Sequence, residues 1–280
     1  NVPIQANISI NYDHNEVDIN SGLSWPFNKP NWMQTRMTGS VANLNSLLKG
    51  AGIILPYSIE NIKIQANIEG VSDQKIQIKP DVNVMVNSAP IELYGEVNLN
   101  LANLHQLAQY NLVTTINGED NTLKIKGMTG VPSETADWAD VNIKTHFASA
   151  AIFDFLASTP EPSLGALKEI NSDLNIDASN GKLNLNIADI STKYSGGELS
   201  LKGRASYGMY LANLPLSAGI FFSDSKSGDG VQLNANGFLG KDGGATAKLF
   251  MKVNNLSYYS DLAGTKLPSL ENINLNSEMS

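Results

Sequence analysis

Residues 180–206, NGKLNLNIADISTKYSGGELSLKGRAS, contain the pattern that decides the fold class. Apolar side chains occupy alternate positions and polar ones fill the positions between them; the apolar positions are Leu183, Leu185, Ile187, Leu199 and Leu201. Successive side chains of a β-strand point to opposite faces of the sheet, so this alternation predicts two strands with one apolar and one polar face. The Asn180-Gly181 and Gly196-Gly197 pairs are typical of the turns that separate such strands.

The same alternation recurs along the chain, in residues 62–68, 76–78, 82–86, 91–101, 231–235 and 245–253. Turn signals rich in glycine and asparagine, among them Asn87-Ser88 and Asn117-Gly118, separate these runs at intervals of roughly ten residues. These intervals, together with one polar face per strand, favour an antiparallel meander over alternating strands and helices. We therefore predict a mostly β protein with a sheet of about fourteen strands.

The apolar positions of these strands form a candidate lipid-binding stripe. Its members all alternate with polar neighbours: Ile62, Ile64, Ile76, Ile78, Val82, Val84, Leu183, Leu185, Ile187, Leu199, Leu201, Leu233 and Leu249. Packing against a second layer of strands is one explanation for such a stripe, and contact with the acyl chains of a lipid is the other.

Three short segments break the alternation and are predicted to be helical: residues 42–49, 147–157 and 256–263. Gly50 and Gly264 follow the first and the third, where the C-terminal cap of a helix favours glycine. Three short helices cannot cover so large a sheet. Its apolar face must therefore pack on another part of the sheet, close into a barrel, or remain an open groove for an apolar ligand. The residues alone favour a closed core and an open groove equally.

The helical segments also reveal an internal repeat. Residues 41–70 and 253–279 share Asn-Leu, a helix, a glycine, Leu-Pro, Glu-Asn-Ile and a strand, and residues 146–179 form a looser copy. Ile62, Ile170 and Ile273 align the copies at an interval of about 105 residues. The predicted organisation is the end of one repeat, two full repeats and the start of another, with boundaries at 1–40, 41–145, 146–252 and 253–280. We interpret the whole as one elongated module cut from a longer protein.

The composition argues against several classes of partner. The formal net charge is −8, and the 19 lysine and arginine residues are scattered, so neither a nucleic-acid footprint nor a polybasic membrane patch is expected. The chain has no cysteine, which rules out thiolate catalysis, cysteine zinc sites and disulfides. No segment approaches the roughly 20 apolar residues of a membrane-spanning helix.

No catalytic or metal-binding pattern emerges from the titratable residues. His14, His105 and His146 are the three histidines, and none stands at a zinc-ligand spacing from another. We interpret Asp137 and Asp140 as solvated turn residues and not as a catalytic carboxylate pair. We therefore predict that the protein is not an enzyme and uses no cofactor or metal.

Three glycine-rich or aromatic stretches have a structural interpretation. Residues 237–244, GFLGKDGG, lack the spacing of a phosphate-binding loop. Residues 224–230, DSKSGDG, are predicted to form a hairpin turn, because Lys226 stands where a calcium loop needs an acidic ligand. The aromatic loop at 25–33, WPFNKPNWM, is expected to pack over the sheet.

Two stretches resemble the AsmA-like family. Residues 180–206 resemble its recurring signature of a glycine turn, an alternating strand, a Tyr-x-Gly-Gly turn at Tyr194–Gly197 and a strand that ends in small residues. Residues 39–56 resemble the family's strand, short helix and Leu-Pro linker, and residues 256–268 repeat that pattern. The asparagine-rich polar face and the loop at 25–33 depart from the family signature.

The resemblance implies a fold and a function. Members of this family, with the related TamB proteins, are Gram-negative envelope proteins with an inner-membrane anchor and a periplasmic array of repeated, curved β-sheets. The implied fold is a mostly antiparallel open groove or half-barrel, with one short helix per repeat. The implied function is phospholipid transport between the inner and outer membranes, with acyl chains on the apolar stripe. Envelope proteins are further expected partners. The alternative is a structural or outer-membrane-assembly module with a closed β core and no lipid.

Overall fold

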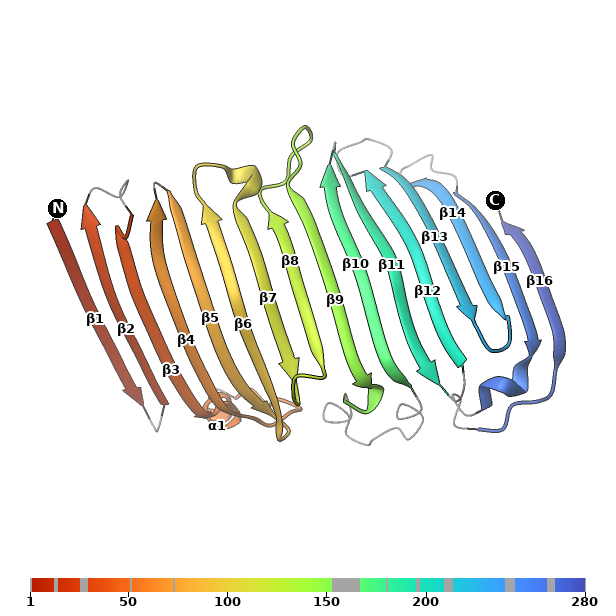
Figure 1. Ribbon diagram of the computed structural model, residues 1–280, viewed down its shortest axis with the longest axis horizontal. Helices are drawn as coiled ribbons and strands as arrows, with labels where there is room; N and C mark the ends of the chain where they lie inside the picture. Colours follow the sequence, from red (N-terminus) through yellow and green to blue (C-terminus); the bar gives the residue numbers. More distant parts are fainter. Residues whose placement is uncertain are drawn as a thin grey trace. The chain divides into compact units, whose positions relative to one another are not determined.

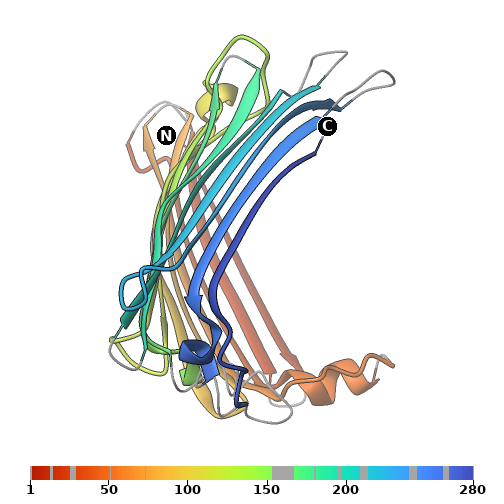
Figure 2. The same ribbon diagram turned by 90° about the vertical axis from the view of Figure 1, so that its right-hand side faces the viewer.

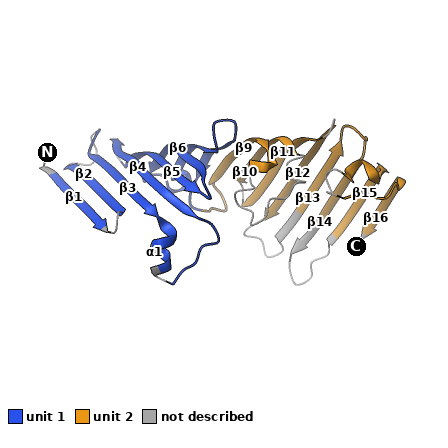
Figure 3. Cartoon of the chain, turned by 90° about the horizontal axis from the view of Figure 1, so that it is seen from below, with its two compact units in different colours: residues 1–131 blue, residues 132–280 orange. Residues whose placement is uncertain are grey.

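A computed structural model describes residues 2–12, 15–25, 30–50, 52–72, 74–152, 167–179, 181–194, 197–208, 214–239, 245–260 and 265–279. The chain divides into two compact units, unit 1 (Asn1–Val131) and unit 2 (Pro132–Ser280), coloured separately in Figure 3. The boundary between the units falls inside the repeat predicted at 41–145. Each unit is described by itself below.

Unit 1 is an antiparallel sheet of eight strands in which neighbours in sequence are neighbours in the sheet (Figure 1). The strands are β1 (Val2–Tyr12), β2 (Asn15–Trp25), β3 (Met33–Asn43), β4 (Ile59–Ser72), β5 (Lys75–Val86), β6 (Ala89–Asn100), β7 (Ala108–Ile116) and β8 (Thr122–Thr129). Two short helices accompany them, α1 (Leu44–Gly50) and the 3₁₀ turn η1 (Leu104–Gln106).

Unit 2 has the same plan, and its strands bend along their length (Figure 2). Its strands are β9 (Ala139–Ser149), β10 (Lys168–Ser179), β11 (Lys182–Tyr194), β12 (Gly197–Gly208), β13 (Leu214–Asp224), β14 (Gly230–Leu239), β15 (Ala245–Asn255) and β16 (Glu271–Met279). The 3₁₀ helix η4 (Leu256–Tyr259) connects β15 to β16.

The predicted mostly β, antiparallel class is confirmed, and the sheet is open. Within each unit, strands contact their neighbours in sequence, and the described residues contain no pairing that closes the first strand onto the last. A barrel, one of the arrangements left open by the sequence, is therefore not the fold of either unit.

Tight turns form where the sequence predicts them. Asn87 and Ser88 both adopt positive φ, 46° and 70°, between β5 and β6. Positive φ at both central residues matches the right-handed twist of the flanking strands, which is why such turns join antiparallel neighbours. Asn117 and Gly118 likewise adopt positive φ between β7 and β8.

The helix predictions have mixed outcomes. The first is confirmed, since α1 covers most of residues 42–49. Its cap, however, is Gly52 and not Gly50: Gly52 has φ 79°, and the N–H groups of Gly52 and Ile53 donate to the carbonyls of Lys49 and Leu48. This pair of bonds is a Schellman motif, which needs a residue with positive φ.

The second helix prediction is wrong at its start, because residues 147–149 belong to β9; residues 153–157 lie outside the described ranges. The third segment begins as the 3₁₀ helix η4, not as an α-helix, and residues 261–264 lie outside the described ranges.

Strand β5 joins two runs that looked separate in sequence. Pro80, which lacks an N–H donor, lies inside this strand opposite Ala66 of β4. On its other side the pairing with β6 omits Pro80 and Gly95. Gly95 adopts φ 145°, and a Cβ there would lie 2.2 Å from the carbonyl oxygen of Asn111. The proline is thus accommodated by a glycine-specific distortion in the next strand.

Candidate functional site

The predicted stripe residues of unit 1 all lie on one face of its sheet. Directly opposed residues of an antiparallel pair point to the same side. Ile64 of β4 is opposite Val82 of β5, and Ile68 is opposite Ile78. By the alternation along each strand, this face also carries the remaining predicted residues, Ile62, Ile76 and Val84.

The same face continues across the other strands of unit 1. Val82 is opposite Leu93 of β6, which is opposite Thr114 of β7, which is opposite Leu123 of β8. Toward the other edge, Ile64 is opposite Gly39 of β3. We call this side of the sheet the apolar face of unit 1.

A β-bulge extends the apolar face to the start of β4. The register between β4 and β5 shifts between Glu60 and Lys63, and Asn61 adopts a positive φ of 51°. The extra residue reverses the alternation, so that Ile59, opposite Val86, lies on the same face as Ile62. In a regular strand, Ile59 and Ile62 would lie on opposite faces, because they are three residues apart.

The predicted stripe residues of unit 2 also share one face. Ile187 of β11 is opposite Gly203, and the row continues through Ile220 and Leu233 to Leu249 of β15. The other members on this apolar face of unit 2 are Leu183, Leu185, Leu199 and Leu201.

A second bulge explains why the alternation fades after Ile187. Ile187 is opposite Gly203 and Ile190 is opposite Leu201, so two residues, Ala188 and Asp189, face the single residue Lys202. The bulge returns Ile190 to the apolar face, on which Ile187 lies.

Among the described residues, no second layer of strands packs over either apolar face within its unit. Ile4, Ile8 and Ile10 in unit 1 are 57%, 52% and 58% exposed, and Leu185 in unit 2 is 36% exposed. Helix α1 contacts β3 and β4 and lies at the ends of these strands, not across them (Figures 1 and 2). Side chains that would form a core in a sandwich are therefore open to a ligand.

Two pairs of hydroxyl groups on the apolar faces satisfy each other. Ser21 and Thr35 are directly opposed in unit 1, with 2.8 Å between their hydroxyl oxygens. Thr145 and Ser172 form the equivalent 2.7 Å pair in unit 2. A hydroxyl with its own partner costs less to desolvate than a lone one, so these four residues are compatible with an apolar ligand.

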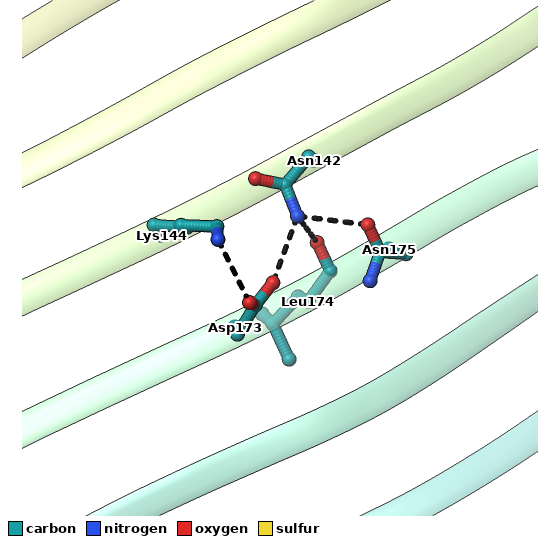
Figure 4. Close-up of polar contacts among 5 residues, drawn as sticks. All are labelled: Asn142, Lys144, Asp173, Leu174 and Asn175. Carbon is teal, nitrogen blue, oxygen red and sulfur yellow. Dashed lines mark hydrogen bonds and ion pairs between the residues drawn. The ribbon is translucent and has the colours of Figure 1, made fainter.

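The opposite, polar face of unit 2 carries cross-strand networks (Figure 4). The side-chain amide of Asn142 donates to Asp173 and Asn175, each at 2.8 Å, and Lys144 pairs with Asp173 at 3.0 Å. The hydrogen bond from Lys144 is the main reason why the pKa of Asp173 lies below its ordinary value. This face carries cross-strand hydrogen bonds and an ion pair between charged and amide side chains, in contrast to the apolar face.

A buried polar cluster lies at the ends of β11, β13 and β15. Asp224 and Asp229 are 2% and 3% exposed. Tyr194 and Tyr259 lie with their hydroxyl oxygens 2.8 and 3.0 Å from Oδ2 of Asp224, and Tyr259 is also 2.7 Å from Oδ2 of Asp229. We call these residues, with Ser227, the tyrosine–aspartate cluster.

The cluster holds Asp224 ionised. Burial alone would raise the pKa of Asp224, but hydrogen bonds from Ser227, the Lys226 N–H and the two tyrosines outweigh it, and the pKa lies below its ordinary value. Burial, followed by the hydrogen bond to Asp224, raises the pKa of Tyr194. The cluster is a structural clasp: Tyr194 and Ser227 donate to Asp224, and the one proton of the Tyr259 hydroxyl is shared between Asp224 and Asp229.

Sequence reasoning missed this cluster. It treated residues 224–230 as an isolated hairpin turn and assigned Tyr194 to turn geometry. Tyr259 is distant in sequence from both, and no local pattern connects it to them. The one available signal is the density of turn-forming Asp, Ser and Gly residues between Asp224 and Gly230.

The described histidines do not lie together. His146 bonds Asn171 at 2.7 Å, His105 lies 3.4 Å from the Val131 carbonyl oxygen, and His14 lies outside the described ranges. Within those ranges, no group of three or more histidine, aspartate or glutamate side chains has the geometry of a metal site.

The aromatic loop packs on the sheet through Trp32. Its indole N–H donates to the Ser72 carbonyl at 3.0 Å, and its ring covers Gly70 so closely that a Cβ there would lie 2.4 Å from it. The side chain of Trp25 and residues 26–29 lie outside the described ranges.

The chain matches no protein-family model, no curated protein and no solved structure. Among the described residues, no helix is both long and apolar enough to cross a membrane.

Proposed function

We propose that this chain is a periplasmic segment of a bridge-like lipid-transport protein, and that the apolar faces of its units bind the acyl chains of phospholipids. The observation that carries the proposal is a largely apolar face in each unit over which the described residues place no second layer of strands. Location in the envelope, an anchor in the inner membrane and transport between the two membranes rest on the AsmA-like resemblance.

The energetics of the apolar face support an acyl ligand. Each buried CH₂ group stabilises a complex by roughly 0.8 kcal/mol, so a long acyl chain contributes on the order of 10 kcal/mol before ordering costs. Because neighbouring rows offer similar side chains, a chain that moves from one row to the next exchanges one apolar contact for another. Movement along the face then needs no catalytic residue.

The finer architecture in this proposal is a curved groove repeated about every 105 residues. It is supported by three residues of positive φ near the starts of β4, β10 and β16. Asn61, Glu169 and Asn272 adopt φ of 51°, 51° and 55°, and each precedes the isoleucine that aligns the copies in sequence. The strands before them, β3, β9 and β15, recur at the same interval.

Site-specific photo-crosslinking tests the proposal. A benzoylphenylalanine at Ile78, on the apolar face, is expected to crosslink to phospholipid in intact cells or during purification. The matched control is Lys79, the next residue of β5 and on the polar face, which is expected to give no lipid adduct. Equal lipid adducts at both positions, or none at Ile78, would reject the lipid face and favour the structural or assembly module.

A further inference from the structure

We propose a second ligand site, for an acidic sugar, on the polar face of unit 2. A shallow hollow of about 330 Å³ lies there over β11 to β14. Its lining includes Lys202, Arg204, Gly219, Phe221, Gln232 and Asn234. This site lies on the side of the sheet opposite the proposed lipid face and is independent of it.

The strand register builds the hollow around a glycine. Gly219 of β13 stands between Arg204 of β12 and Asn234 of β14, and all three point to the polar face. Because Gly219 has no side chain, the row is open at its centre. In the next row, Phe221 stands between Lys202 and Gln232 and forms one wall.

The charge of the hollow selects an anion. Lys202 and Arg204 lie two residues apart on the same strand face, and in the part of the chain that the structure describes neither side chain forms an ion pair or a hydrogen bond. Two adjacent unpaired cations in a chain of net charge −8 attract a carboxylate, and a guanidinium binds one through two parallel hydrogen bonds.

A hollow of similar size on the polar face of unit 1 carries the opposite charge. It has a volume of about 340 Å³ but is lined by Glu16, Asp18 and Asp81 beside a single cation, Lys63. Its carboxylates disfavour an anion, so the hollow of unit 1 serves as an internal comparison.

The remaining side chains indicate a sugar and not a bare anion. Phe221 is 47% exposed on the polar face. Its ring offers an apolar platform of the kind on which the C–H face of a pyranose packs. The exposed amides of Gln232 and Asn234 supply donors and acceptors for sugar hydroxyls. The ligand class that satisfies all three features is a saccharide that carries carboxylates, such as a uronic acid oligomer.

Calorimetric titration of the whole chain with trigalacturonate tests this site, with the neutral trisaccharide maltotriose and inorganic phosphate as comparison ligands. Trigalacturonate is expected to bind at least about tenfold more tightly than maltotriose. Its affinity is expected to fall as the NaCl concentration is raised. Arg204→Gln and Phe221→Ser are each expected to lower the affinity for trigalacturonate by about tenfold. Lys182→Gln, on the same polar face of β11 but outside the hollow, is the matched control and is expected to change nothing.

Three results would overturn the site. The first is no heat of binding with trigalacturonate while circular dichroism shows folded protein. The second is equal weakening by Lys182→Gln and Arg204→Gln, which indicates diffuse charge. The third is binding of phosphate as tight as that of trigalacturonate with no effect of Phe221→Ser, which indicates an anion site without sugar recognition.

Discussion

Tyr194 donates a 2.8 Å hydrogen bond to Asp224, and this contact ties the end of β11 to the end of β13 across the intervening strand β12. Gly197, directly opposite Tyr194, lies under the tyrosine ring. The tyrosine and the second glycine of the Tyr-x-Gly-Gly signature are thus one packing unit, and the buried carboxylate of Asp224 is its anchor. This relationship gives the Tyr-x-Gly-Gly sequence at Tyr194–Gly197 a physical role beyond turn geometry.

Tyr194→Phe is expected to destabilise the protein by about 1–3 kcal/mol, because it removes a donor from a buried carboxylate. The urea midpoint of unfolding measures the loss. Tyr258→Phe is the matched control, since Tyr258 is 47% exposed, and it should leave the midpoint unchanged. Equal midpoints for the two variants would contradict the clasp.

The free energy of unfolding should fall at acid pH, in part because Asp224 becomes protonated. Its pKa in the folded chain lies below the ordinary value of 3.8. Its contribution is therefore fully present above the unfolded pKa and is lost as the pH falls through the lower folded pKa. Urea midpoints from about pH 6 to about pH 2.5 should fall more steeply for the wild type than for Asp224→Asn. Parallel curves for the two proteins would show that the pKa of Asp224 is not lowered in the folded chain.

Gly197→Ala is expected to destabilise the protein by about 1–3 kcal/mol through overpacking. The added methyl would lie 2.7 Å from the Tyr194 ring and from Cβ of Lys226. Gly22→Ala is the control, because its nearest neighbour is the Gln34 carbonyl oxygen at 3.7 Å, an ordinary contact. Thermal denaturation of both variants checks the difference, and a larger loss for Gly22→Ala would refute it.

Leu185→Asp is expected to abolish lipid binding while the protein stays folded, at a cost of about 1–3 kcal/mol. The reason is that Leu185 lies on an uncovered face and not in a sealed core. Lipid extracted from the purified variant and its far-UV circular dichroism are the two readouts. Asn186→Asp, the next residue and on the polar face, should retain lipid. Global unfolding of Leu185→Asp would indicate a closed core instead.

Asp173→Asn should lower stability by less than about 1 kcal/mol, even though Lys144 and Asn142 both contact Asp173. The Lys144–Asp173 pair lies on the polar face, where water screens it and solvates Lys144 after the substitution. Chemical denaturation of Asp173→Asn and of Asp224→Asn, measured side by side, compares the two losses of stability. A loss as large as that of Asp224→Asn would mean that the polar network of Figure 4 is a structural core.

Much of the architecture was predictable because alternation and turn chemistry are local. The parity of Leu183, Leu185 and Ile187 is a property of one strand, so their common face needed no tertiary information. The turn at Asn87-Ser88 was equally readable, because these residue types tolerate the φ values that a tight hairpin requires. Helix α1 was predicted, but its cap moved to Gly52, since end positions depend on where backbone hydrogen bonds stop.

The bulges at Asn61 and Ala188 were not predictable in the same way. Each depends on how one strand pairs with its neighbour, and an extra residue in a strand reverses every later side chain. The helical prediction over residues 147–149 failed for a related reason. Apolar residues with small neighbours satisfy both periods over a short run, and pairing with β10 selected the strand.

The sequence by itself determined the mostly β class, the antiparallel order and the two chemically distinct faces, because strand periodicity and turn geometry act between residues that are close in the chain. Only the tertiary structure decided that no described strand covers the apolar faces within their units, that Tyr194 and Tyr259 converge on Asp224, and that Lys202, Arg204 and Phe221 surround a hollow at Gly219. These features depend on the register between strands and on burial. Neither register nor burial is determined within a single stretch of residues.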